Sequence, residues 1–216
     1  GHTSAQYNLG VWYANGEGVA EDDVEAVRWY QKAAEQGYAD AQYNLGLMYA
    51  NGEGVAEDGV ETVKWFRKAA EQGHVLAQVN LGVAYDNGMD VAEDDVESVR
   101  WYRKAAEQKN ARAQYNLGLM YAAGEGVAED EVEALKWYRK AAEQGHTSAQ
   151  YNLGNLYVRG EGVPKNDIEA YKWWHLAAAQ GYEDAKKNKR ILANRITKEK
   201  IAEAQKRASD FKPRSN

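Results

Sequence analysis

Cysteine is absent from this 216-residue sequence, and proline and phenylalanine occur only twice each. Without cysteine the chain can form neither a disulfide framework nor a thiolate metal site. No stretch approaches the eighteen or more consecutive apolar residues of a membrane-spanning helix, so we expect no such helix. No signal peptide is recognisable at the N-terminus, but this observation identifies no compartment.

Positive charge is scarce over most of the chain. Residues 1–185 hold 16 Lys/Arg against 30 Asp/Glu, whereas residues 186–216 hold 11 against 3. The net charge is therefore −14 for the body and +8 for the tail. An acidic body repels phosphates, so we predict that it binds no nucleic acid. The basic tail is expected to be a solvated helix, although it could also touch acidic lipid or RNA.

The aromatic residues reveal an internal repeat. Seven Trp and fifteen Tyr stand beside the two Phe, a bias that indicates one short pattern written several times. The period is 36 residues, without insertion or deletion, and such a period decides the architecture. Three residue types recur at this period: the tryptophans Trp29, Trp65, Trp101, Trp137 and Trp173, the asparagines Asn8, Asn44, Asn80, Asn116 and Asn152, and the glycines Gly10, Gly46, Gly82, Gly118 and Gly154.

Each repeat carries the pattern of two amphipathic helices. In the first repeat, apolar residues recur at helical spacing over residues 3–14, and the glycine-containing sequence 15–18 ends this first helix. Asp22 is expected to cap the second helix, with Glu25 three residues later completing a capping-box-like pattern. Gly37 is expected to stop it. The corresponding caps in the other repeats are Asp58, Asp94, Asp130 and Asn166.

A glycine lies inside the first helix of every repeat, as Gly10 does in the first. Glycine in a helix interior costs about 0.8–1 kcal/mol relative to alanine, so five of them need an offsetting contact. The second helix always carries a small residue at the position of Ala26. We expect the glycine to meet this small residue, so that the two helices touch backbone to backbone.

These patterns predict an all-α fold, a right-handed α/α superhelical solenoid of five 36-residue helix–turn–helix repeats with a C-terminal helical cap. Thr197 is expected to cap the last helix. The first ten residues recur identically at Gly145–Gly154, so the sequence starts at a repeat joint and we expect it to be a piece of a longer chain. The expected repeats are 1–37, 38–73, 74–109, 110–145 and 146–181, followed by capping helices over 182–212 and a frayed tail over 213–216.

The segment Ala41–Gly73, AQYNLGLMYANGEGVAEDGVETVKWFRKAAEQG, resembles the Sel1-like repeat, a relative of the tetratricopeptide repeat. The matching features are Ala-x-x-x-Leu-Gly-x-x-Tyr, Gly-x-Gly-Val, the aspartate cap, Trp-Tyr/Phe and Lys-Ala-Ala-x-Gln-Gly, and they extend over residues 1–181. The last segment is also similar to the family's C-terminal cap. The resemblance implies a bacterial adaptor in signalling, assembly or host interaction rather than one particular activity.

Two features depart from that family pattern. Some members carry cysteine pairs that bridge the helices of a repeat, and a penicillin-binding or β-lactamase activity has been attributed to that branch; this chain has no cysteine. In the third repeat, Met89-Asp90 replaces Glu-Gly and Lys109 replaces the joint glycine. We expect Asp90 and Asn110 to supply left-handed conformations there. The third repeat is either the result of neutral drift or a specialised site.

No residue pattern points to catalysis. The recurring carboxylates are typical of loops and helix caps, and the sequence Gly-Glu-Gly at 16–18 lacks the lysine and the strand–helix context of a phosphate loop. We therefore expect no enzyme activity, no metal and no cofactor. The four histidines, His2, His74, His146 and His175, do not follow metal-ligand spacing, and three of them are expected to be surface or joint residues.

By analogy with tetratricopeptide arrays, the first helix of each repeat is expected to line a concave groove that binds a protein or peptide. Tyrosine offers a rigid amphipathic ring and asparagine a two-way hydrogen-bonding amide, so both suit recognition. For the asparagines, an equally open alternative is that Asn8 and its copies cross-link neighbouring helices. The predicted partner-binding residues are Tyr7, Asn8, Asn15, Asp40, Tyr43, Asn44, Asn51, Asn80, Asp86, Arg112, Tyr115, Asn116, Tyr151, Asn152 and Arg159.

The predicted groove charges are polarised. Asp40 and Asp86 belong to the N-terminal half, and Arg112 and Arg159 to the C-terminal half. This arrangement suits a segment with its basic end towards repeats 2–3 and its acidic end towards repeats 4–5. The predicted function is thus a monomeric protein-interaction scaffold.

Two alternatives to an interaction scaffold remain open at the level of the sequence. Near-identical repeats would also suit a structural or engineered array without a specific ligand. The family resemblance adds a cell-wall or β-lactam-binding enzyme. The sequence does not identify the compartment: the resemblance is compatible with a periplasmic or secreted protein and equally with a cytoplasmic one.

Overall fold

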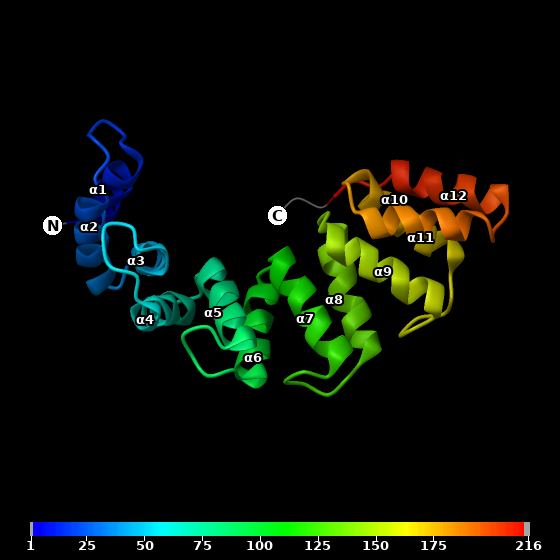
Figure 1. Cartoon of the computed structure of the whole chain (residues 1–216), viewed down its shortest axis with the longest axis horizontal. Coiled ribbons are helices and arrows are strands. Elements are labelled where there is room, and N and C mark those ends of the chain that lie inside the picture. The colour runs from blue at the N-terminus through cyan, green and yellow to red at the C-terminus, as the bar shows by residue number, and fades with distance from the viewer. Residues whose placement is uncertain (1, 214–216) are drawn as a thin grey trace. The chain divides into compact units, whose positions relative to one another are not determined.

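The computed structural model describes residues 2–213, whose regular structure is entirely α-helical (Figure 1). No strand occurs in this range, so the all-α prediction is confirmed. Each repeat is a pair of 13-residue helices, and two shorter helices follow the fifth repeat. In chain order the helices are α1 (Thr3–Asn15), α2 (Asp23–Glu35), α3 (Ala39–Asn51), α4 (Gly59–Glu71), α5 (Val75–Asn87), α6 (Asp95–Glu107), α7 (Ala111–Ala123), α8 (Glu131–Glu143), α9 (Thr147–Arg159), α10 (Asp167–Ala179), α11 (Glu183–Ala193) and α12 (Lys198–Ser209).

The second helix of each repeat starts at its predicted cap. The Asp22 carboxylate accepts a hydrogen bond of 3.0 Å from the backbone N–H of Glu25. Such a bond satisfies one free N–H group of the first turn and contributes about 1 kcal/mol. Thr197 caps α12 in the same way, by accepting from the N–H of Lys200. The other predicted caps are also confirmed: Asp58, Asp94, Asp130 and Asn166.

The joint before α7 has a lysine where other joints have glycine. Gly37 has a φ of +86° at the first joint, and Lys109 adopts the same left-handed region with a φ of +67°. Asp90 is also left-handed, as predicted. The prediction for Asn110 is wrong: its φ is −68°, and its side chain accepts a hydrogen bond from the N–H of Ala113. The turn needs the positive φ at the position of the glycine itself, so the residue after it is free to cap the next helix.

The glycine inside each first helix faces an aromatic ring. A Cβ on Gly10 would lie 2.6 Å from Cδ1 of Tyr30, and a Cβ on Gly82 would lie 2.6 Å from Cδ1 of Tyr102. The expected contact with the small residue near Ala26 is therefore not the main reason for the glycine. The glycine makes room for the aromatic ring, which stands four residues after the position of Ala26 on the second helix. The remaining pairs are Gly46 with Phe66, Gly118 with Tyr138 and Gly154 with Trp174.

Buried glutamines join consecutive repeats. Gln42 is 4% exposed and donates from its amide to the backbone carbonyl of Ala34 at 3.0 Å, at the end of the preceding helix. Its side-chain oxygen accepts from Gln72 at 2.7 Å. Both ends of the buried amide are thus satisfied, which fixes the register of one repeat against the next. The same bond to the preceding helix is made by Gln78, Gln114 and Gln150.

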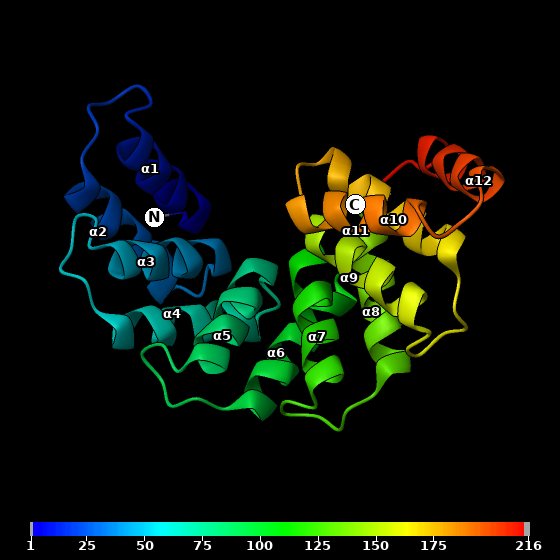
Figure 2. The ribbon, with the colours of Figure 1, turned by 45° about the vertical axis from the view of Figure 1, so that its right-hand side comes forward.

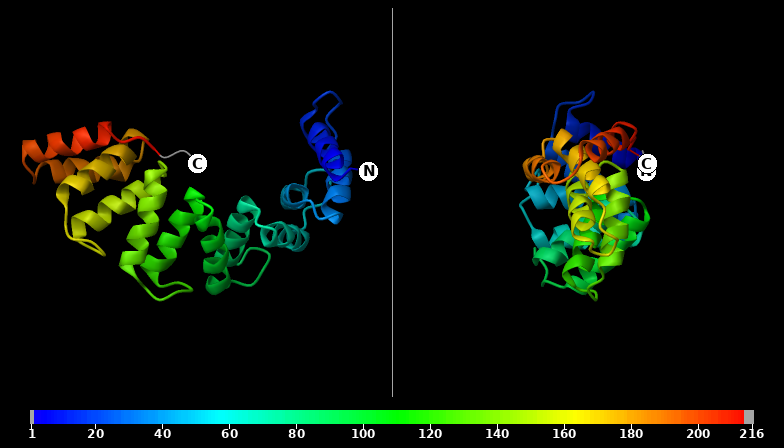
Figure 3. Two further views of the ribbon diagram at one scale, coloured as in Figure 1. Left: turned by 180° about the vertical axis from the view of Figure 1, so that it is seen from behind. Right: turned by 90° about the vertical axis from the view of Figure 1, so that its right-hand side faces the viewer.

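The helices form two compact units, one up to residue 105 and one from residue 106 onward. Leu45 and Leu81 are fully buried in the first unit, and Leu117 and Leu153 in the second. Figure 3 shows the loops between the paired helices of a repeat, such as the dark blue loop between α1 and α2. Over residues 2–213, no helix has both the length and the apolar character needed to cross a membrane.

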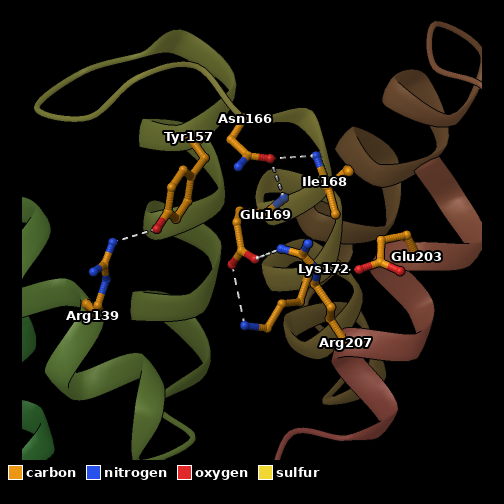
Figure 4. A network of polar contacts seen from close by, with 8 residues as sticks. All are labelled: Arg139, Tyr157, Asn166, Ile168, Glu169, Lys172, Glu203 and Arg207. Carbon is orange, nitrogen blue, oxygen red and sulfur yellow. Dashed lines mark hydrogen bonds and ion pairs between the residues drawn. The ribbon is translucent and has the colours of Figure 1, made fainter.

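The last helix packs against the second helix of repeat 5. In Figure 2, α12 (red) lies beside α10. Phe211 meets the Trp173 ring edge-on, with centroids 5.5 Å apart, and Ala204 is fully buried. Arg207 of α12 forms an ion pair with Glu169 of α10 at 2.8 Å (Figure 4). These contacts cover a face of α10 that would otherwise expose aromatic side chains.

Candidate binding site

The predicted groove tyrosines are half-buried and pack against other rings. Tyr43 of α3 stacks on Phe66 of α4 with centroids 5.6 Å apart, and on His74 with centroids 4.5 Å apart. One neighbour comes from the second helix of the same repeat and the other from the joint to the next repeat. The ring is therefore held rigidly while part of it stays exposed, which suits a contact surface. Comparable ring contacts join Tyr7 to Tyr30 and Tyr38, Tyr115 to Tyr138 and His146, and Tyr151 to Tyr182.

Two of the predicted asparagines contact tyrosines of the preceding repeat. Burial raises the pKa of Tyr30, and a hydrogen bond with Asn44 lowers it. Asn44 also bonds with Tyr7. In the second unit, Asn152 makes the corresponding bonds with the hydroxyls of Tyr115 and Tyr138. These contacts support the alternative in which the asparagines cross-link neighbouring repeats.

The other predicted asparagines differ in exposure. Asn8, Asn15 and Asn51 are exposed. Asn15 and Asn51 each donate a hydrogen bond to the loop glutamate two residues later, at 3.3 and 3.2 Å. Asn80 and Asn116 are half-buried. Equivalent asparagines therefore share their environment, except that Asn8 of the first repeat is exposed whereas its copies are half-buried.

The two predicted acidic residues belong to the first unit. Asp40 is exposed, and its Oδ1 lies 3.5 Å from Nε2 of His74. Asp86 is half-buried and accepts a hydrogen bond of 3.2 Å from the hydroxyl of Tyr102. Burial raises the pKa of Asp86, and the Tyr102 hydroxyl lowers it. Asp40 thus faces solvent, whereas Asp86 is already engaged within its own repeat.

The two predicted arginines belong to the second unit, and both are exposed. Arg159 lies 3.6 Å from the carboxylate of Glu161. Arg112 is close enough to His146 to lower the pKa of that imidazole, an effect secondary to burial. An exposed ion pair of this kind contributes little to stability, so Arg159 can exchange Glu161 for a ligand.

His74 and His146 have a structural role that the sequence analysis did not assign. Nδ1 of His74 accepts a hydrogen bond of 3.1 Å from the N–H of Ala77, and His146 does the same with Ala149 at 3.3 Å. Each imidazole therefore caps a first helix while it stacks on a tyrosine of the repeat before. Their shared place in the repeat, at the joint, was the only available signal.

A pocket of about 320 Å³ opens in the first unit between α3, α4 and α5. This volume is at the lower end of the range of roughly 300–1,000 Å³ for ligand pockets. Leu47, Phe66 and Val83 contribute apolar walls, and Glu57 and Asp90 contribute carboxylates. The pocket therefore lies where two consecutive first helices meet the helix between them.

A second pocket, of about 180 Å³, occupies the corresponding place in the second unit, between α9, α10 and α11. Trp174 and Asn188 line it at the positions that Phe66 and Asn80 hold in the first pocket. The charged residues that line it are arginines, Arg159 among them, whereas those of the first pocket are carboxylates. The sequence analysis found Arg159 but missed Arg195, the other arginine of this pocket.

Within 2–213, no three side chains of His, Cys, Asp or Glu come together in a way that could hold a metal ion.

Two solved structures are similar to this chain over nearly its whole length. A protective antigen of uropathogenic Escherichia coli with an SLR fold is 40% identical, with a TM-score of 0.86, over 97% of this chain and 46% of the antigen. A Sel1 repeat protein from Oxalobacter formigenes is 35% identical, with a TM-score of 0.80, over 100% of this chain and 88% of that protein. This chain thus spans less than half the length of the Escherichia coli antigen. Among curated proteins, none matches the chain.

The Sel1 repeat matches five times in succession, over residues 3–38, 39–74, 75–110, 111–146 and 147–182. Members of this family are in general protein-interaction scaffolds. Because the matches leave only the two ends of the sequence uncovered, this chain belongs to the Sel1 repeat family.

Proposed function

We propose that the chain is a non-catalytic protein-interaction module that binds a peptide or protein segment along the first helices of its repeats. The observation that carries this proposal is the pair of corresponding pockets with opposite charge. The pocket of the first unit presents Glu57 and Asp90, and the pocket of the second unit presents Arg159 and Arg195. Similar geometry with reversed charge suits a ligand whose own charge is polarised.

The half-buried tyrosines supply the apolar contact beside these pockets. Tyr43 stacks on Phe66, which lines the first pocket. The hydroxyl of Tyr151 accepts a hydrogen bond from Asn188, which lines the second pocket. Rigid aromatic residues at the centre of an interface typically carry more binding energy than charges at its rim.

The charges set the direction of the proposed ligand. Asp40 adds an exposed carboxylate to the first unit, and Arg112 adds an exposed cation to the second. A basic stretch of the ligand would bind the first unit and an acidic stretch the second. Such charges steer association and select orientation more than they increase affinity.

The test uses peptides selected from a displayed random library on the parent chain. Replacing Tyr43 and Tyr115 by valine is expected to weaken binding by about 30-fold, equivalent to roughly 2 kcal/mol, in calorimetric titrations. Valine is the appropriate replacement because Val79 occupies this position in repeat 3 and is buried there without disrupting the fold.

A matched control changes exposed side chains of the second helices in the same two repeats. Lys64 and Lys136 are exposed residues of α4 and α8, each paired with a glutamate on its own helix. Charge reversal of both should leave affinity within about twofold, because exposed pairs contribute little. If the lysine reversals abolish binding and the valine replacements do not, the ligand uses the second helices and the proposed surface is wrong.

The same selection addresses the two alternatives. An array without a ligand would enrich no peptide above the background obtained with an unrelated helical protein. An enzyme acting on β-lactams would hydrolyse nitrocefin, and the hydrolysis would be retained in the tyrosine variant. A selected peptide together with absent nitrocefin turnover is the outcome expected here.

A further inference from the structure

The pocket of the first unit is larger than its counterpart in the second unit because side chains at this joint are smaller. Ala84 stands where the repeat before has Met48. Phe66 stands where the first repeat has Tyr30, and so lacks a hydroxyl. Both residues line the pocket. The other residues at the position of Ala84 are all large: Trp12, Met120 and Leu156.

A carboxylate has also exchanged places with a glycine. At the joint of repeats 1 and 2, α2 starts with Asp23, and Gly54 approaches it so closely that a Cβ on the glycine would overlap the Asp23 carbonyl. At the joint of repeats 2 and 3, α4 starts with Gly59, and Asp90 occupies the position of Gly54. An acidic residue also starts the second helix of the other repeats: Asp95, Glu131 and Asp167.

The glycine and the aspartate fit each other. A Cβ on Gly59 would overlap the carboxylate of Asp90, so the aspartate can take this position only because residue 59 has no side chain. Two departures from the repeat pattern that depend on each other are not expected from independent drift. The exchange moves a carboxylate from the start of a helix to the rim of the pocket.

The chemistry of the pocket is that of an acidic rim over apolar walls. Glu57 and Asp90 are both exposed, whereas Val63 and Ala84 are buried. The residues found to line this pocket include no lysine or arginine. The amide of Asn80 adds a hydrogen-bond acceptor in the same wall.

We propose that this pocket accepts one lysine or arginine side chain of the partner, a proposal that rests on the proposed function and specifies its ligand chemistry. The aliphatic stem lies against Leu47 and Val83, and the cationic head lies between Glu57 and Asp90. Long cationic side chains combine an apolar stem with a charged end in this way. A purely apolar side chain would desolvate the carboxylates without pairing them, and an anionic one would be repelled.

The test monitors backbone amide NMR signals of the full chain during titration with n-butylguanidinium chloride, a surrogate for the arginine side chain. Saturable shifts are expected at Gly59 and Ala84. The neutral analogue pentanamide and the anionic analogue pentanoate should bind at least about fivefold more weakly, as the loss of one ion pair of about 1 kcal/mol implies.

Two variants change the pocket in different ways. Ala84→Met fills it with the residue found at position 48, and Asp90→Gly removes a carboxylate while restoring the glycine found at position 54. Each should weaken n-butylguanidinium binding by at least about fivefold. The controls are Leu156→Met, the equivalent position in repeat 5, and Glu53→Gln, an exposed loop carboxylate that does not line the pocket. Both should bind like the parent.

The outcomes separate this inference from the proposed function. Absence of saturable shifts, equal binding of pentanamide, or unchanged binding by Ala84→Met overturns the pocket assignment. Selected peptides that bind the parent and Ala84→Met equally, but fail to bind the tyrosine variant, would leave the proposed function standing without the pocket. If the library yields no peptide at all, the proposed function fails, whatever the fragment result.

Discussion

At the scale of single residues, the internal glycine of each first helix is set by the ring that packs over it. Gly82 is buried, and a Cβ on it would lie only 2.6 Å from Cδ1 of the Tyr102 ring. The hydroxyl of the same tyrosine donates to Asp86, four residues further along α5. The ring is thus held at both ends of one helical turn, so it has little freedom to move aside.

Gly82→Leu is therefore expected to destabilise the chain by more than about 3 kcal/mol, above the usual range for an overpacked core, because the new side chain collides with an anchored ring. Urea denaturation measures the change. Val96→Leu is the control, because Val96 belongs to the same repeat and is 65% exposed. Equal unfolding midpoints for the two variants would show that the ring yields easily and that the glycine has another cause.

Tryptophan shows a second residue-scale regularity. The Trp137 ring lies under the ammonium group of Lys140, 3.8 Å from the ring centroid, and Lys68 lies 3.9 Å from the centroid of Trp65. A cation over an aromatic face contributes about 0.5–1 kcal/mol at an exposed site. The indole N–H groups of the five repeating tryptophans have no hydrogen-bond partner, so their place depends on packing: Trp29, Trp65, Trp101, Trp137 and Trp173.

At the scale of elements, the joints between repeats combine a helix cap with a ring stack. His146 caps α9 and stacks on Tyr115. Burial lowers the pKa of His146, and Arg112 lowers it further. Burial also lowers the pKa of His74, although Asp40 opposes this shift. Both imidazoles are therefore favoured in the neutral form by the folded chain.

The sign of the pH dependence follows from these shifts. An unfolded histidine has a pKa of about 6.5, above the folded value, so the unfolded chain binds more protons as the pH falls through this region. The stability contributed by the two imidazoles is thus present above about pH 6.5 and lost below it.

We expect His146→Tyr to reduce the loss of thermal stability between pH 8 and pH 5. Tyrosine stands at the equivalent position at the start of repeat 2 (Tyr38) and at the start of the C-terminal cap (Tyr182), where it also packs against a tyrosine ring. Melting temperatures across the pH range provide the measurement. His2→Gln serves as the control, because His2 is exposed and caps no helix through its side chain. An identical pH profile in parent and His146→Tyr would contradict this account.

At the scale of the whole molecule, stacked repeats need a covered end. In the second unit the cover is α11 and α12, which pack on α10. Trp173 and Trp174 are each only 4% exposed beneath them and their neighbours. The Glu169 carboxylate joins Lys172 of its own helix to Arg207 of α12, as Figure 4 shows. A salt link and an aromatic contact therefore hold the same helix in place.

Deleting residues 186–216 should expose this apolar face and cause self-association, because large exposed apolar patches drive aggregation. Sedimentation velocity at increasing protein concentration measures the effect. The double variant Arg207→Gln with Phe211→Ala should show the same tendency more weakly, whereas Lys187→Gln, on the exposed side of α11, should not. A truncated chain that stays monomeric and melts at the parental temperature would show that the segment is not a cap.

The sequence by itself determined the repeat, the class of fold and the helix starts, because each depends on local information. An apolar helical spacing and a cap such as Asp22 are visible within one or two helical turns, and the 36-residue period is visible when segments of the sequence are compared with one another. The conformation of the turns was predictable only in part. The left-handed conformation of Asp90 was predicted correctly, but at the next joint the left-handed residue is Lys109 and not Asn110. The sequence identified the repeating tyrosines as candidate groove residues, and their role in binding remains a prediction.

Only the tertiary structure decided what each repeated residue touches. The ring over Gly82 comes from a different helix, the Gln42 amide reaches back to the preceding repeat, and neither contact has a local signature. The first pocket depends on the coincidence of Gly59, Ala84 and Asp90, which are up to 31 positions apart in the sequence. A repeat period shows which positions are equivalent. The free volume at each joint depends on the side chains that three helices contribute together, so it is determined only when those helices pack.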